Sequence, residues 1–233
     1  MRLLAVDTAE KSCSLALVDD GNPVCESFFA SEVNHSRVLM DMIEHLVRTR
    51  ANVDLDTIDG FVVARGPGSF TGLRIGISVV KGLAFALSKP VAGVCSLDGI
   101  AMQLPLSPSP VYAMMDARRG EVYAAMYRFS RGALTARGPS TLVRPEDLVS
   151  GIQGPAVFAG SGAMAYRHII EQALGHDAWF APGYLNGIRA GALAQVVFDN
   201  PGILSRELAL LMPVYLRRSD AELNYERHPD RFS

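Results

Sequence analysis

The sequence predicts an α/β protein built from two similar halves, each a mixed β-sheet flanked by helices. Three observations support this fold class. Each half opens with two strand-like runs that meet near an aspartate, each continues with an apolar run that enters a glycine-rich turn and a helix, and a proline-rich segment at 104–110 separates the halves. We therefore expect a first domain at 1–104, a smaller second domain at 105–220 and a tail at 221–233.

The first two runs predict a β-hairpin. Residues 3–8 are apolar as far as Asp7, residues 13–18 alternate, and a short polar segment joins them. The second half repeats this pattern, because residues 111–115 lead to Asp116 and then to a return strand. Aspartate at such a bend commonly accepts a hydrogen bond from nearby backbone, an interpretation that outweighs metal binding.

A glycine-rich turn at 66–72 follows the next apolar run of the first half. Strand, glycine turn and helix in that order often bind phosphate. Neither nucleotide-binding pattern fits, because Thr71 stands where a dinucleotide fold needs its third glycine and Leu73 stands where a Walker loop needs lysine. The turn therefore predicts a backbone device that starts a helix, and residues 156–162 repeat it in the second half.

Two helices of the first half are more apolar than one sheet face requires. The helix at 34–49 has a wide apolar surface, and the helix that opens at Thr71 is apolar almost all round, apart from Arg74, Ser78 and Lys81. We give equal weight to two interpretations, core helices of a compact domain and a surface that a second protein covers.

Composition excludes several classes of protein. Lysine and arginine total 22 against 24 acidic residues, so the chain lacks the positive field that drives nucleic-acid binding by itself. Three widely spaced cysteines without a C-x-x-C indicate reduced, mostly buried thiols, and neither a disulfide framework nor a zinc site. We find no signal peptide and no run approaching the length of a membrane span, and we expect a cytosolic protein.

The sequence contains no complete set of catalytic residues. His35 and His45 are ten positions apart, and Leu39 occupies the place where an H-x-x-x-H metal motif needs its second histidine. No serine lies in a G-x-S-x-G turn. Arg118 and Arg119 suit either a solvated turn or an anion contact. We therefore predict no catalytic residue, no metal site and no cofactor.

Segments spread from residue 3 to about residue 222 resemble the TsaB (YeaZ) family. They read LLAVDTAEKSCSLALVDDG, NHSRVLMDMIEHL, RGPGSFTGLRIGISVVKGLAFA, MMDARRGEVYAAMY and PVYLRRSDAE. The resemblance implies two tandem actin-like, ribonuclease-H-like (ASKHA) domains, in agreement with the duplication. In that superfamily a glycine-containing hairpin wraps nucleotide phosphates. The turn here has no glycine, so Asp7 and Thr8 would line a vestigial nucleotide cleft.

The resemblance also implies a non-catalytic role. The chain would activate TsaD, which transfers a threonylcarbamoyl group to the adenine beside the anticodon of tRNAs reading codons that begin with A. Its implied partners are TsaD in a heterodimer, the ATPase TsaE, a second copy when TsaD is absent, and tRNA only through the complex, with no membrane. The implied partner surface comprises His35, Leu39, Met42, Ile43, Leu46, Leu73, Gly76, Ile77 and Val80.

Two other functions stay open. An independent actin-like ATPase or small-molecule kinase would agree with the fold and with Asp7, although the glycine-free turn and the absent general base oppose it. A metalloprotease of the glycoprotease type would need a second histidine beside His35. We expect no catalytic activity from the chain alone, and the sequence does not decide between monomer and dimer.

Overall fold

The computed structural model describes residues 1–30 and 35–217, and for residues 35–37 it describes the backbone alone. The first half forms a five-stranded mixed sheet in the order β3-β2-β1-β4-β5. Its strands are β1 (Arg2–Asp7), β2 (Ser12–Asp19), β3 (Asn22–Ala30), β4 (Gly60–Gly66) and β5 (Val91–Cys95). Strands β1, β2 and β3 are antiparallel neighbours, whereas β1, β4 and β5 run parallel.

The second sheet has the same order and the same strand directions, β8-β7-β6-β10-β11, with β9 pairing on β7. Its strands are β6 (Val111–Asp116), β7 (Val122–Ser130), β8 (Ala133–Arg137), β9 (Thr141–Val143), β10 (Ala156–Ala159) and β11 (Ala178–Phe180). Asp7 and Asp116 are the last residues of the two central strands, β1 and β6. The predicted duplication is therefore confirmed at the level of topology.

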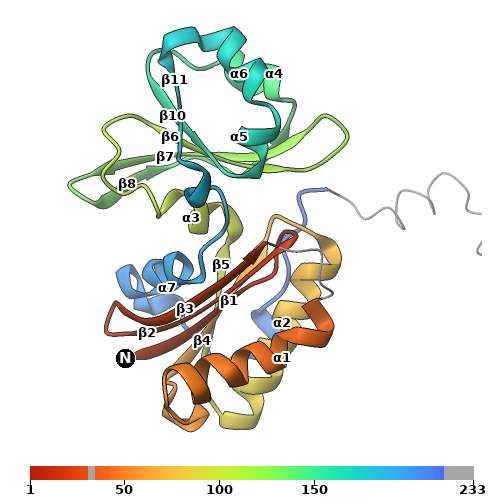
Figure 1. Ribbon diagram of the computed structural model, residues 1–233, viewed down its shortest axis with the longest axis vertical. Coiled ribbons are helices and arrows are strands. Elements are labelled where there is room, and N and C mark those ends of the chain that lie inside the picture. The colour runs from red at the N-terminus through yellow and green to blue at the C-terminus, as the bar shows by residue number, and fades with distance from the viewer. Residues whose placement is uncertain (31–34, 218–233) are drawn as a thin grey trace, which may run out of the picture.

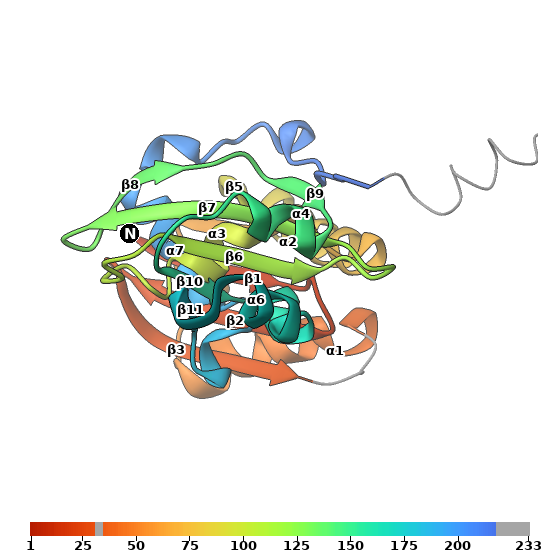
Figure 2. The same ribbon diagram turned by 90° about the horizontal axis from the view of Figure 1, so that it is seen from above.

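Helices separate and cover the two sheets. The outer face of the first sheet carries α1 (His35–Glu44), which continues as the π-helix η1 (His45–Arg50), and α2 (Phe70–Leu87). Between the sheets lie α3 (Ser96–Ala101) and α7 (Ala190–Asp199). The outer face of the second sheet carries α4 (Pro145–Ser150), α5 (Ser161–Ala165) and α6 (Arg167–Leu174). Figure 1 shows these layers stacked along the long axis of the molecule, and Figure 2 looks down through the stack with the second domain nearest the viewer.

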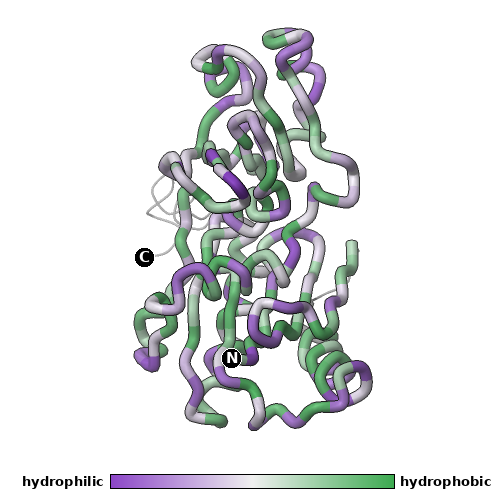
Figure 3. The backbone as a smooth tube through the Cα atoms, turned by 90° about the vertical axis from the view of Figure 1, so that its left-hand side faces the viewer, coloured by the Kyte–Doolittle hydropathy of each residue, from purple (hydrophilic) through white to green (hydrophobic). Residues whose placement is uncertain are grey.

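Short 3-10 turns complete the chain. They are η2 (Leu55–Thr57), η3 (Gly175–Asp177), η4 (Gly183–Leu185), η5 (Pro201–Ile203) and η6 (Leu208–Leu210). Figure 3 shows hydrophobic stretches along much of the backbone, and hydrophilic residues in several of the peripheral loops.

The central strand β1 shows why the layers form. Leu4 and Val6 pack in the cluster beneath α1 and α2, whereas Leu3 and Ala5 pack in the cluster between the sheets. Because both faces are covered, the strand is apolar throughout instead of alternating with polar residues. Met115 of β6 lies in the same middle cluster as Leu3, so the two halves share one core.

The C-terminal part of the chain returns to the first sheet, which differs from the expected division at 105–220. Helix α7 packs against β1 and β2, and it contributes Leu193 and Val197 to the middle cluster. Farther along, Ser205 pairs with Val91 of β5. We therefore use "first domain" for the first sheet with α1, α2, α3, α7 and residues 200–217, and "second domain" for the second sheet with α4, α5 and α6. The predicted tail at 221–233 lies outside the described residues.

Helix α2 is long and apolar enough, by length and composition alone, to cross a membrane. This finding corrects the expectation that no segment reaches that length. The helix is part of the folded domain, because Leu73, Ile77 and Val80 are buried in the cluster over the first sheet. Its apolar character therefore follows from packing.

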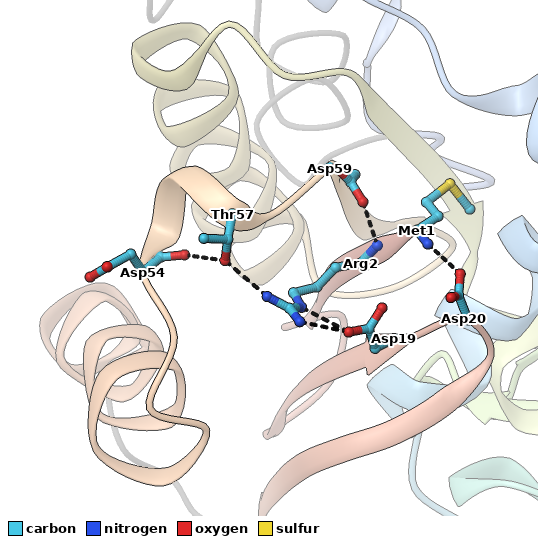
Figure 4. A network of polar contacts seen from close by, with 7 residues as sticks. All are labelled: Met1, Arg2, Asp19, Asp20, Asp54, Thr57 and Asp59. Atoms are coloured by element: carbon cyan, nitrogen blue, oxygen red, sulfur yellow. Dashed lines mark hydrogen bonds and ion pairs between the residues drawn. The ribbon is translucent and has the colours of Figure 1, made fainter.

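A polar network closes the end of the first sheet at the start of β1 (Figure 4). The guanidinium of Arg2 donates two hydrogen bonds to Oδ2 of Asp19, at 3.1 and 2.7 Å, and a third to Oγ1 of Thr57 at 3.1 Å. The backbone N–H of Arg2 donates to Asp59 at 2.7 Å. One residue thus joins β1, β2 and the segment that leads into β4.

Replacing Arg2 should test this network. We expect Arg2→Ala to lower the free energy of unfolding by about 1–3 kcal/mol, since charge-assisted hydrogen bonds to a half-buried carboxylate are lost. Urea denaturation at neutral pH measures the change. Arg48→Ala is the control: Arg48 lies 4.0 Å from Glu44 and its side chain is 61% exposed, so its removal should change stability by less than about 0.5 kcal/mol. An equal loss of unfolding free energy in the two variants would show that the Arg2 network does not stabilise the sheet.

Candidate functional site

Asp7, the first residue of the predicted cleft, is fully buried at the end of β1. Its Oδ1 accepts a hydrogen bond from the backbone N–H of Ala9 at 3.0 Å, which confirms the predicted backbone role. Oδ2 is buried with no hydrogen-bond partner. In the second domain Asp116 makes the equivalent bond with the N–H of Arg118 at 2.8 Å, but Asp116 is exposed. The two bends therefore share a backbone device and differ in burial.

Burial, with a smaller contribution from the nearby Glu10 carboxylate, raises the pKa of Asp7 to about 8. The Asp7 side chain is therefore largely a neutral acid at pH 7. Metal binding requires a deprotonated carboxylate, so Asp7 is poorly prepared to hold a cation.

The first glycine turn packs against the backbone of its own hairpin. Thr8 donates a hydrogen bond from Oγ1 to the carbonyl oxygen of Gly72 at 2.8 Å, and the N–H of Ser69 donates to the carbonyl oxygen of Ala9 at 2.7 Å. A Cβ at Gly72 would overlap the Thr8 carbonyl oxygen, and a Cβ at Gly76 would overlap Thr8 Oγ1. The glycines thus allow this close approach, and the N–H groups of Ser69 and Gly72 already donate within the chain instead of pointing freely at an anion.

The second glycine turn packs against the central strand of its own sheet in a similar way. Gly160 has φ +105°, and a Cβ there would overlap the carbonyl oxygen of Met114 in β6. The N–H of Gly160 donates to Oδ1 of Asn186 at 2.8 Å. Each glycine turn is therefore packed against the central strand or bend of its own sheet.

One hydrogen-bonded chain joins the two bends across the domains. Ser161, at the start of α5, donates from Oγ to the carboxylate of Glu10 and accepts from the N–H of Asp116 at 3.0 Å. Burial raises the pKa of Glu10, and the bond from Ser161 opposes that rise. No sequence signal indicated that Glu10 and Ser161 would form a pair, because they are 151 residues apart.

Most of the predicted partner-contact residues lie inside the first domain. Met42 is half-buried, and the side chain of His35 lies outside the described part of the chain. The buried ones are Leu39, Ile43, Leu46, Leu73, Gly76, Ile77 and Val80. A side chain buried in its own domain offers little surface to a partner, so these residues could support a contact face mainly from beneath. Whether the two helices contact a partner stays a prediction.

The outward face of α2 is formed by other residues. Phe70, Arg74, Ser78 and Phe85 are exposed, and Phe85 is 79% exposed. Their spacing of four, four and seven residues puts them on one side of the helix, and this spacing, together with the polar line of Arg74 and Ser78, is the sequence signal that could have identified this face.

Metal and thiol chemistry have little support in the described part of the chain. Within residues 1–30 and 35–217, no group of three His, Cys, Asp or Glu side chains could hold a metal ion. Cys13, Cys25 and Cys95 are free thiols, as predicted. Burial raises the pKa of Cys13 to about 12, so its reactive thiolate is scarce at neutral pH.

Comparison with known proteins identifies relatives over nearly the whole chain. The family model described as TsaD, tRNA N6-adenosine threonylcarbamoyltransferase, matches residues 30–225. TsaB of Bacillus subtilis is 30% identical, covering 97% of this chain and 98% of the relative. TsaB of Escherichia coli is 35% identical over 71% of this chain and 74% of the relative. The solved structure of YeaZ from Pseudomonas aeruginosa superposes with a TM-score of 0.78 at 31% identity, covering 92% and 99% of the two chains.

Duplicated sheets with identical strand order, joined through a shared helical layer, define a two-domain protein of the actin-like (ASKHA) fold. At both glycine turns, backbone of the chain itself lies against the glycines. The chain belongs to the TsaB (YeaZ) family, whose relatives are named tRNA threonylcarbamoyladenosine biosynthesis proteins.

A pair of glycine substitutions in α2 tests the close approach at Thr8. Gly72→Ala should destabilise the protein by at least about 2 kcal/mol, because the new methyl group would overlap backbone that has little room to move. Gly82→Ala is the matched control in the same helix. It has open space around its α-carbon and should raise stability by up to about 1 kcal/mol through helix propensity. Chemical denaturation measures both, and a harmless Gly72→Ala would disprove the packing role.

The buried acid predicts a particular pH dependence of stability. The pKa of Asp7 is raised on folding, so the folded state retains a proton that the unfolded chain loses, and stability falls as pH rises from about 4 to about 8. Asp7→Asn should reduce that slope by up to about 1.4 kcal/mol per pH unit and be more stable than the parent at pH 7.5. Urea midpoints between pH 5 and 8.5 provide the measurement. Parallel curves for the two proteins would show that Asp7 is not buried as a neutral acid.

Proposed function

We propose that this chain is a non-catalytic partner and activator of TsaD. In this role it supports transfer of threonylcarbamoyl to the adenine beside the anticodon of tRNAs reading codons that begin with A. The observation that carries the proposal is the close packing of Thr8 and Ala9 against the first glycine turn, which uses that turn for contacts within the chain. Family membership supplies the pathway.

The proposed assembly follows the family. TsaD is the heterodimer partner, the ATPase TsaE joins the pair, and a second copy of the chain takes the place of TsaD when TsaD is absent. Transfer RNA reaches the chain only through the complex, which agrees with the small excess of acidic over basic residues. The proposed compartment is the cytosol.

We infer that the partner covers the outward face of α2 together with α1. Phe85 on α2 and Met40 on α1 are exposed apolar side chains on two helices that pack together over the first sheet. Apolar surface rimmed by polar groups such as Arg74 and Ser78 is typical of a protein interface. The buried residues named from the sequence would then support this face from beneath.

Reconstitution with purified components tests the proposed activity. Transfer RNA modification by TsaD and TsaE, with the threonylcarbamoyl adenylate supplied, should require addition of this chain. The chain alone should neither modify tRNA nor hydrolyse ATP. Modification by the chain in the absence of TsaD, or micromolar binding of Mg-ATP to it in calorimetry, would contradict the proposal and favour the ATPase or kinase alternative.

A charge on the outward face of α2 should separate binding from folding. Phe85→Glu changes a side chain that is 79% exposed, so the folded state should persist while TsaD binding weakens at least about tenfold through desolvation of the new carboxylate. Leu106→Glu is the control, since Leu106 is 82% exposed in the segment before β6, away from α2. A pull-down and sedimentation measure binding, and circular dichroism measures folding. A folded Phe85→Glu variant with normal TsaD binding would place the interface elsewhere.

A further inference from the structure

Residues 205–217, called here the C-terminal strap, run from the first sheet toward the second domain. In Figure 1 the blue end of the chain rises beside α2 to the level between the domains. Ser205 is anchored to β5 by two backbone hydrogen bonds with Val91, both 2.8 Å long. Farther along, Leu211 is buried while its neighbours Leu210 and Met212 are exposed. The strap is therefore held at separate points and does not form a layer of core.

The second anchor is the first glycine turn. The N–H of Val214 donates to the carbonyl oxygen of Arg65 at 2.7 Å, at the end of β4. Gly66 has φ +122°, and a Cβ there would overlap the carbonyl oxygen of Val214. Glycine is thus required twice, for the backbone angle and for the close approach of the strap.

An aromatic contact holds the next residue of the strap. The ring of Tyr215 stacks on Phe70 at the first turn of α2, with 4.7 Å between the ring centroids. The guanidinium of Arg74 lies over the Phe70 ring, 4.0 Å from its centroid, and its Nε donates a hydrogen bond to the Tyr215 hydroxyl at 3.3 Å. The strap is therefore fixed to the first domain up to Tyr215.

The last anchor belongs to the other domain. The guanidinium of Arg217 donates to the carbonyl oxygens of Ala117 and Arg118 and forms an ion pair with Glu121. These acceptors are the two sides of the bend between β6 and β7, which follows Asp116. The Arg217 side chain is only 18% exposed, so water screens the ion pair less than it would on an open surface.

We propose that the strap is a clasp between the domains, with Arg217 as the positioning residue that holds the second bend against the first glycine turn. The arrangement favours this role over simple tail packing. Between Leu216 and Arg217 the strap passes from the first domain to the second. The planar guanidinium of Arg217 matches one carboxylate and two carbonyl oxygens of a single bend. The Glu10–Ser161 bridge makes a second link between the domains, from the bend after β1 to the start of α5. The proposal is independent of the proposed function.

Hydrogen exchange of the full-length chain can test the clasp residue by residue. Two amides report the bend: the N–H of Ala117, which donates to the carbonyl oxygen of Glu121 at 3.0 Å, and the N–H of Glu121, which donates to that of Arg118 at 3.1 Å. Arg217→Ala should speed exchange of these amides by about tenfold or more, since the bonds lost involve a charged group. Arg217→Lys keeps the charge and loses the fork, so its effect should be intermediate.

Arg206→Ala is the matched control, because Arg206 lies on the same strap and donates to the carbonyl oxygen of Ser88 within the first domain at 2.8 Å. It should leave exchange at the bend unchanged. Unchanged exchange at Ala117 and Glu121 in Arg217→Ala, or an equal rise in the core amides of β4 and β6, would each overturn the proposal.

Discussion

Close packing of the first hairpin bend against the start of α2 is the contact on which the first domain depends. Small residues in the glycine turn let the backbone of Thr8 and Ala9 lie against the helix, and Thr8 bonds to Gly72. Because α2 starts from this fixed point, Leu73 and Ile77 are directed onto the sheet. The opposite side, including Phe85, is left to solvent. A pattern that resembles a phosphate loop thus serves the packing of the chain on itself.

The local parts of this fold could be predicted from the sequence, and the long-range parts could not. Strand periodicity and turn chemistry are properties of short segments, so the bends at Asp7 and Asp116 and the glycine turns were found correctly. The return of α7 to the first sheet was missed, because an apolar helix does not specify which sheet it covers. The Glu10–Ser161 bridge was missed for a similar reason. For α2, periodicity identified an apolar helix without showing which side faces inward, and the α2 residues named for partner contact lie on the buried side.

The two halves show how a duplicated scaffold can diverge. Asp7 and Asp116 keep the same bond to backbone, yet one is buried as a neutral acid and the other is exposed. Both central strands contribute to a single middle core in which Leu3 and Met115 take part. Between the two sheets, helices α3 and α7 and the middle cluster join the halves into one packed unit.

The late position of α7 in the chain has a consequence for biosynthesis. During translation β1 and β2 leave the ribosome first, but the face of the sheet toward the second domain is fully covered only after residues 190–199 have been made, because α3 covers only part of it. Leu3 and Ala5 therefore gain some of their partners nearly two hundred residues downstream. The N-terminal half alone lacks this part of its core. Chaperones that shield apolar strands would have their main opportunity in this interval.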